Sequence, residues 1–272
     1  MGKKLYVINL RGEKEPFYFK KVYLSARKAG ASKELALEIA KKVEEEAFPG
    51  ISTLEIFDRI FEILLQRCPQ SAIKFNLKGA IRKLGPTGFP FEKFVGKIFE
   101  AEGYEVKLNE KIRGKCTVYE IDFLAKKGNL IYIGECKFHH VPGERVNLQT
   151  ALSNFARFLD IKKGGLLNFN LIYKSILVTN TKFTKKAIDY SKCVGVELLG
   201  WKYPKGRGLE ELIEENKLYP ITILPSVSSN LGKFLIENKI VLVRDVFTKK
   251  FEKLKISKKR EIEKEAKILL SQ

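Results

Sequence analysis

The chain has 272 residues, 44% hydrophobic and 31% charged, a balance typical of a soluble globular protein with two or three small domains. No apolar run approaches the roughly 18–20 residues of a membrane span, and the N-terminus lacks the apolar core of a secretory signal, so we expect a cytoplasmic protein with no membrane partner. Lys and Arg number 51 against 32 Asp and Glu, and the formal charge of +19 indicates a polyanionic partner.

The residue types limit both the partner and the metal. Nucleic acid is the first candidate partner and an anionic membrane surface the second, whereas a Lys- and Glu-rich surface of the thermophilic kind would balance the two signs. The four cysteines form no C-x-x-C pair, and the two histidines are His139 and His140. Any metal site must therefore depend on carboxylates, which favours Mg²⁺ or Mn²⁺ over zinc.

The first third of the chain is predicted to be one strand followed by helices. Residues 5–10 are apolar and β-prone, and a turn signal follows at 11–14. Helical apolar spacing then covers residues 20–29, 32–48, 51–67 and 72–84. A Gly/Pro cluster at residues 85–90 predicts a domain boundary.

Beyond this cluster the pattern changes to alternating helices and strands, which predicts an α/β sheet domain. The expected elements are a helix at 90–102, strands at 104–108, 117–125 and 130–138, a helix at 147–162, a strand at 175–179, a helix at 184–192 and a strand at 196–199. From about residue 206 the strand pattern ends, and short amphipathic helices with a basic excess are predicted.

Two charges interrupt the otherwise apolar strand predicted at residues 130–138, namely Glu135 and Lys137. Burying a charge costs several kcal/mol unless it is paired or coordinated. The strand period of two puts Glu135 and Lys137 on one face. A hairpin turn before this strand would place Asp122 opposite Ile133 and diagonal to Glu135, about 7–8 Å away on the same face. Two carboxylates so placed can share one cation.

This cluster has the residue types that phosphodiester hydrolysis requires. Asp122 and Glu135 would hold Mg²⁺ through hard oxygen ligands, and the ion would lower the pKa of an attacking water. Lys137 would orient this water and stabilise negative charge on the phosphate. An ordinary buried network of Asp, Glu and Lys ion pairs is the other explanation, because a D…ExK match alone is a weak signal.

Four short motifs in this region resemble the Mrr-like branch of the PD-(D/E)xK nucleases over about residues 85–200. They are Phe91-Glu92-Lys93-Phe94-Val95, Gly103-Tyr104-Glu105-Val106, Glu120-Ile121-Asp122 and Glu135-Cys136-Lys137. The resemblance implies a restriction-endonuclease-like mixed-sheet core over residues 85–205 that cuts DNA.

Within this resemblance, Glu92 is expected to complete the metal site, and Gln149 on the following helix is expected to approach it. One departure is that Ile121, rather than the nominal Pro, precedes Asp122. For Glu92 a second explanation is an exposed residue near a helix N-terminus, where a negative charge is favoured. His139 and His140 either contact phosphate or begin the loop after the strand.

Residues 6–22 and 25–29 resemble an ATP-cone domain, a nucleotide-sensing module. The residues that match its pattern are Gly12, Phe17, Lys21 and Ala29. The resemblance implies a helical N-terminal domain over residues 1–84 that binds ATP or dATP as an effector, since no P-loop is present to use ATP as fuel.

In that domain the predicted nucleotide-binding residues are Lys21, Arg27 and Arg11, whose positive charges suit phosphate. The basic pair that the family carries before its glycine is replaced by Asn9-Leu10, with Arg11 in the usual acidic position. A helical interaction domain that kept the fold and lost the ligand is the alternative.

Residues 206–272 are predicted to form a small basic helical domain that binds DNA. Segments 231–238 and 241–247 are predicted as paired short helices, similar to a helix-hairpin-helix module but without its expected glycine. A basic face that follows phosphates explains the lysines of this tail, and a solvated surface helix explains them nearly as well.

Together these features predict an α/β protein of three parts: a helical ATP-cone-like domain, a restriction-endonuclease-like core and a small helical C-terminal domain. The leading hypothesis is a Mg²⁺- or Mn²⁺-dependent DNA endonuclease regulated by ATP or dATP. A homodimer is expected because one site cuts one strand. The alternatives are a nucleotide-responsive DNA-binding regulator that does not cleave, and a nucleic-acid-binding structural protein whose charge is its function.

Overall fold

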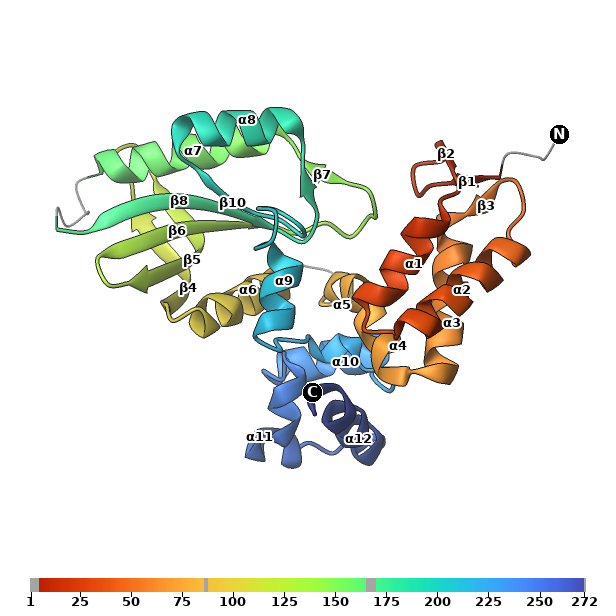
Figure 1. Ribbon diagram of the computed structural model, residues 1–272. Coiled ribbons are helices and arrows are strands. Elements are labelled where there is room, and N and C mark those ends of the chain that lie inside the picture. Colours follow the sequence, from red (N-terminus) through yellow and green to blue (C-terminus); the bar gives the residue numbers. More distant parts are fainter. Residues whose placement is uncertain (1–4, 86–87, 165–169, 272) are drawn as a thin grey trace. The chain divides into compact units, whose positions relative to one another are not determined.

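The computed structural model describes residues 5–85, 88–164 and 170–271 and shows an α/β protein with mixed sheets and several helices (Figure 1). Its contacts divide the chain into two compact units. The first contains residues 1–80, 223–227 and 256–272, and the second contains residues 81–222 and 228–255. The division into domains at 1–84, 85–205 and 206–272 stays a prediction. Pro86 and Thr87 of the Gly/Pro cluster lie outside the described residues.

The first unit begins with a small sheet of three short strands in the order β2-β1-β3. Strand β1 (Tyr6–Ile8) is antiparallel to β2 (Lys14–Pro16) and parallel to β3 (Ile51–Ser52). The predicted strand at 5–10 is confirmed by β1. Strands β2 and β3 were not predicted, because two or three residues are too few to show the period of a strand.

The helices predicted in this unit are confirmed, with one division. They are α1 (Phe19–Lys28), α2 (Lys33–Glu46), α3 (Thr53–Arg67), α4 (Pro69–Phe75) and α5 (Leu77–Arg82), of which the last two residues are counted in the second unit. The predicted helix at 72–84 is therefore two helices that meet at Asn76. Helix α3 begins where it does because Ser52 and Glu55 form a capping box, in which each side chain accepts a backbone N–H of the other residue.

The second unit contains a five-stranded sheet in the order β10-β8-β6-β5-β4. Strands β4, β5 and β6 are antiparallel, whereas β6, β8 and β10 are parallel. Their bounds are β4 (Glu105–Arg113), β5 (Val118–Lys127), β6 (Leu130–Lys137), β8 (Ile172–Thr179) and β10 (Glu197–Leu199), which confirms the predicted strands. A separate parallel pair, β7 (Arg145–Val146) with β9 (Lys182–Phe183), was not predicted.

Helices cover both faces of this sheet (Figure 1). Helices α7 (Leu148–Lys163) and α8 (Lys185–Val194) lie on one face, and α6 (Phe89–Ala101) lies on the other. On the first face Ile161 packs against Ile121 and Ile133. On the other face the Phe99 ring lies 4.9 Å from that of Phe123. The three predicted helices are confirmed, and they enclose the strands that carry the candidate site.

The last part of the chain consists of short helices, as predicted. They are α9 (Leu209–Glu215), the 3₁₀ turns η1 (Ile221–Ile223) and η2 (Val243–Phe247), α10 (Ser229–Glu237), α11 (Lys249–Glu252) and α12 (Lys259–Leu270). The predicted partner of α10 is thus the 3₁₀ turn η2. Helix α12 packs on α4, where Gln70 Nε2 donates a hydrogen bond to the Ile268 carbonyl at 3.0 Å.

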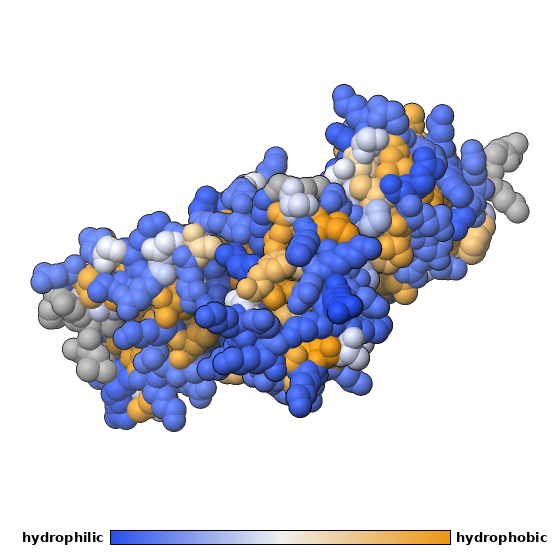
Figure 2. Space-filling view, turned by 90° about the horizontal axis from the view of Figure 1, so that it is seen from below, coloured by the Kyte–Doolittle hydropathy of each residue, from blue (hydrophilic) through white to orange (hydrophobic). Residues whose placement is uncertain are grey.

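Figure 2 shows hydrophilic residues over most of one face, with smaller apolar patches between them. Of the helices in the described part of the chain, none has the length and apolarity to cross a membrane.

Candidate active site

Asp122 and Glu135 lie where strands β5 and β6 stop pairing with each other. The ladder ends at Phe123 and Gly134, and the next residues in the same register are Asp122 and Glu135. Beyond this point β5 continues beside β4 and β6 continues beside β8. The backbone N–H of Cys136 donates to Asp122 Oδ2 at 2.6 Å. The Asp122 carboxylate thus accepts the backbone N–H of Cys136 just past the last paired residues of β5 and β6.

The predicted register was wrong by two residues. Ile133 pairs with Leu124 rather than with Asp122. The reason is the turn, since Lys127 pairs with Leu130 and only Gly128 and Asn129 remain in the loop. Gly128 has φ +60°, as the two-residue turns of hairpins require. The shift brings Asp122 to the position next to Glu135 in the register instead of a diagonal one.

The alternation of β5 is also interrupted at Asp122. Ile121 packs in the cluster with Ile161 of α7, whereas Phe123, two residues later, packs on α6. In a regular strand these two side chains would share a face. On the neighbouring strand, the position opposite Asp122 is Asn109, which has φ 55° in the left-handed region. The strand therefore twists at Asp122, and side chains from both helical layers can reach it.

Glu92 reaches this region from α6. It lies in the first turn of the helix, and the preceding Phe91 is fully buried with its ring 5.3 Å from that of Phe138. Because Phe138 follows β6 directly, this contact holds the first turn of α6 against the end of β6. Burial raises the pKa of Glu92 to about 7, with repulsion from Asp122 and Glu135 as the next causes.

Asp122 and Glu135 differ in how their charges are compensated. Burial and the nearby Glu135 raise the pKa of Asp122 to about 6, against the opposing effects of the Cys136 N–H, Arg157 and Lys137. The Glu135 side chain is 14% exposed and forms an ion pair with Arg157 of α7. The site thus holds three carboxylates in partly buried positions, with one of them in contact with a guanidinium.

Gly134 allows the core to close beneath the site. A Cβ atom added there would overlap the ring of Phe123, which is fully buried. The ring occupies the volume that any other residue would need. Packing of this ring thus explains why a glycine directly precedes Glu135.

The other predicted residues lie at the end of β6, in the loop after it and on α7. Lys137 ends β6 and is exposed. Gln149 is exposed in the first turn of α7, and none of the contacts described joins it to the three carboxylates. His139 and His140 lie in the loop after β6, as one of the two interpretations predicted, and the His139 ring pairs with Glu144 at 2.8 Å.

Arg157 was not predicted. The signal that would have revealed it is helical spacing, because Asn154 and Arg157 lie three residues apart on the side of α7 that also carries the buried Ala151. Asn154 is itself buried and donates to Ser175 Oγ at 2.9 Å. Polar residues on the inward side of an amphipathic helix indicate partners within the protein.

The donor set suits a hard cation, although it is not assembled as a cage. Within residues 5–85, 88–164 and 170–271, no group of three or more His, Cys, Asp or Glu side chains is placed to hold a metal ion. Asp122 and Glu135 offer two oxygen ligands, which is the number Mg²⁺ often takes from a protein. The raised pKa values of Glu92 and Asp122 mean that burial and nearby carboxylates disfavour their charged forms, an effect that a bound cation would offset.

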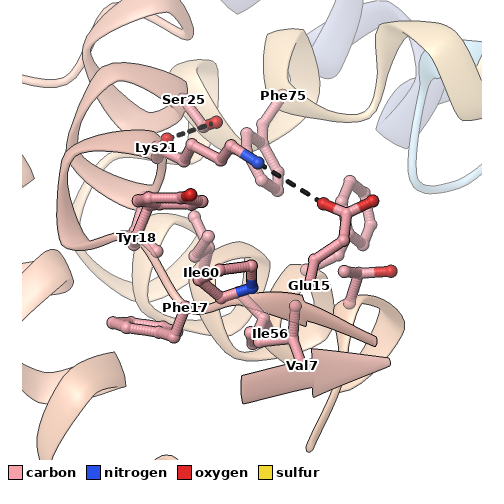
Figure 3. Close-up of a pocket in the computed structure, with 13 residues that line it drawn as sticks. Val7, Glu15, Phe17, Tyr18, Lys21, Ser25, Ile56, Ile60 and Phe75 are labelled. Atoms are coloured by element: carbon pink, nitrogen blue, oxygen red, sulfur yellow. Dashed lines mark hydrogen bonds and ion pairs between the residues drawn. The ribbon is translucent and has the colours of Figure 1, made fainter. Parts of the chain in front are cut away.

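The first unit has a pocket of about 210 Å³ (Figure 3). Lys21 lies in it, with its Nζ 3.5 Å from Glu15 Oε2 and 4.7 Å from the centre of the Tyr18 ring. The walls are largely apolar and include Phe17 and Phe57. Of the three residues predicted to bind nucleotide, Lys21 lines this pocket.

The other two predicted nucleotide contacts lie elsewhere. Arg27 Nη1 donates to the Ala31 carbonyl at the end of α1. Arg11 is exposed in the turn between β1 and β2. Neither of them is among the residues that line the pocket.

The fold and the site define an α/β protein with carboxylates gathered where two strands of a mixed sheet stop pairing. It belongs to the AF1548-like family. The chain is 38% identical over 178 residues to an uncharacterised protein of Archaeoglobus fulgidus, a match that covers 64% of this chain and 98% of that protein. Residues 219–270 match the family described as AF1548-like, C-terminal.

Two solved structures are similar to this one. The crystal structure of the protein of unknown function AF1548 matches with a TM-score of 0.58 and 35% identity, over 68% of this chain and all of that one. The MspJI restriction endonuclease in complex with a 27-mer oligonucleotide matches with a TM-score of 0.28 and 12% identity, over 62% of this chain and 38% of that one. The second likeness is too weak to carry an argument about fold or activity.

Proposed function

We propose that this protein is a metal-dependent endonuclease that hydrolyses phosphodiester bonds of DNA. The observation that supports this is the crowding of Glu92, Asp122 and Glu135 where the β5–β6 ladder ends. Partly buried carboxylates with raised pKa values are typical of sites that bind a cation or transfer a proton. The formal charge of +19 supports a polyanionic substrate.

Each residue has a role in this proposal. Asp122 and Glu135 would hold Mg²⁺ or Mn²⁺. Glu92 would become a third oxygen ligand only after its side chain moves, because the three carboxylates are not placed here to hold one ion. When bound, the cation would supply charge neutralisation and a water of lowered pKa. Lys137 is two residues after Glu135 on β6 and exposed, so it would bind the scissile phosphate and orient the attacking water. Gln149 is proposed as a polar contact to substrate.

We further propose that the second unit contains a restriction-endonuclease-like core of the Mrr-like branch. The element order α6-β4-β5-β6-β7-α7-β8 supports this, because it places the helix with the Phe-Glu pair directly before the sheet. A homodimer is part of the proposal, since one such site cuts one strand of a duplex.

For the first unit we propose an ATP-cone-like module that binds ATP or dATP as a regulator. The pocket with Lys21 supports this, because aromatic walls suit a nucleobase and an ammonium suits a phosphate. Arg11 and Arg27 would have to act from outside that pocket or not at all.

A cleavage assay tests the enzyme proposal. Supercoiled, linear, branched and single-stranded DNA would be incubated with Mg²⁺ or Mn²⁺, for wild type, Asp122→Ala and Lys137→Ala. We expect cutting by wild type and a loss of at least about a hundredfold in each variant. Lys126→Ala is the matched control, because Lys126 is an exposed lysine on the same hairpin. DNA binding without cutting of any substrate would favour the alternative of a non-cleaving regulator.

A calorimetric titration tests the nucleotide proposal separately. We expect ATP or dATP to bind wild type and to bind Lys21→Ala at least about tenfold more weakly. Lys20→Ala is the control, since Lys20 is exposed on the same helix and does not line the pocket. No binding heat at high micromolar nucleotide would reject the ATP-cone function and leave the nuclease proposal untouched.

A further inference from the structure

Arg157 connects the candidate site to α7. Its guanidinium pairs with Glu135 Oε2, and the two side chains are 26% and 14% exposed. Asp122 is next to Glu135 in the register at the end of the β5–β6 ladder, so the charge of Arg157 lies near both predicted ligands. Arg157 therefore contributes positive charge at the carboxylates onto which a divalent cation would bind.

This pairing has a consequence for the cation. A guanidinium stays protonated throughout the accessible pH range, so it cannot leave the carboxylate by losing a proton. A cation that takes an oxygen of Glu135 must therefore compete with Arg157 for it. Both side chains of the pair are partly buried, so a guanidinium displaced from Glu135 would leave a poorly compensated charge unless another anion lies nearby.

DNA supplies such an anion. The planar guanidinium has five N–H donors in a fork that matches two phosphate oxygens. A substrate phosphate at the site would lie beside Glu135, because the attacking water and the ligands must meet there.

We propose that Arg157 is an exchangeable counter-ion: it neutralises Glu135 until a divalent cation binds, and it then turns to a DNA phosphate. This inference rests on the proposed nuclease function. It predicts that Arg157 weakens cation binding to the protein alone. It also predicts that a bound cation strengthens DNA binding, because it frees Arg157 to bind a phosphate. Bound DNA should likewise strengthen cation binding, because the phosphate holds Arg157 away from Glu135.

The test measures binding rather than cleavage. Mn²⁺ is titrated into wild type and Arg157→Gln by calorimetry, with and without a DNA duplex in which phosphorothioates block cutting. We expect Arg157→Gln to bind Mn²⁺ about fivefold or more tightly without DNA, and to lose most of the mutual strengthening by DNA. Its affinity for DNA in Mn²⁺ should fall by about tenfold.

Two further variants separate the effect of the pair from that of charge alone. Lys162→Gln removes one positive charge from the exposed end of the same helix and should change none of these quantities by more than about twofold. Arg157→Lys keeps the charge without the fork, and we expect it to retain part of the competition with Mn²⁺ and to lose the coupling with DNA. Circular dichroism checks that each variant is folded.

The outcomes are distinguishable. Equal Mn²⁺ affinity of Arg157→Gln and Lys162→Gln would overturn the proposal and leave Arg157 as a structural ion pair. Tighter Mn²⁺ binding with unchanged coupling to DNA would overturn the exchange to phosphate. If wild type binds no Mn²⁺ and cuts no DNA, the proposed function itself fails, whatever Arg157 does.

Discussion

Replacement of Glu92 by Gln should stabilise the protein at pH 8 in EDTA and change little at pH 5. Burial and the charges of Asp122 and Glu135 raise the pKa of Glu92 from its ordinary 4.5 to about 7. Because the pKa of Glu92 is higher in the folded chain, its protonation stabilises the fold. This contribution is fully present below about pH 4.5 and is lost as the pH rises through about 7. At pH 8 the wild type therefore holds a repelled charge that the glutamine lacks.

The expected magnitude follows from the size of this shift. A pKa that moves from 4.5 to about 7 corresponds to about 3 kcal/mol between the two protonation states. Glu92 is only partly buried, and solvent screening reduces the effect to about 1–2 kcal/mol. Part of the repulsion is shared with Asp122, so the effects of substituting both carboxylates should not add.

The assay is urea unfolding followed by circular dichroism at pH 5 and pH 8. Glu100→Gln is the matched control: Glu100 is exposed on the same helix, 2.7 Å from Lys97, and its loss should change the free energy of unfolding by less than about 1 kcal/mol. Mn²⁺ at pH 8 should stabilise wild type more than Glu92→Gln. A stability difference between wild type and Glu92→Gln that is the same at both pH values, or a less stable variant at pH 8, would refute the reasoning.

Three further predictions concern the fold around the site and the first unit. Gly134→Ala should lower the free energy of unfolding in urea by about 2–3 kcal/mol, because the new methyl overlaps the Phe123 ring. Adding Phe123→Leu to this variant should restore part of the loss. Ser52→Ala removes the cap of α3 and should cost about 1 kcal/mol in the same measurement; no change would mean that the capping box is not formed in solution. Half-buried Cys136 should react with a thiol reagent more slowly than the exposed Cys193, because burial and the nearby carboxylates raise the pKa of its thiol well above the ordinary value. Equal rates for the two cysteines would contradict this.

The sequence by itself was sufficient for features that depend on near neighbours in the chain. Helices α1, α2 and α3 follow from apolar residues at helical spacing and from local caps such as Ser52. The choice of Glu135 and Lys137 as candidate residues likewise needed only two charges at the strand period within an apolar run. These signals lie within a few residues of one another, so no knowledge of packing was required.

The arrangement of the candidate site was decided by tertiary structure. The two-residue turn at Gly128 and Asn129 set the register of β5 and β6, and Asp122 lies two positions along β6 from where the sequence predicted it. Moving the centre of a turn by one residue is enough to cause this shift, and such a move has no strong signature in composition. Arg157 meets Glu135 because α7 connects the parallel strands β6 and β8 and packs over the sheet between them. Such a contact joins residues 22 positions apart through a crossover, and only the packing of helix on sheet brings them together.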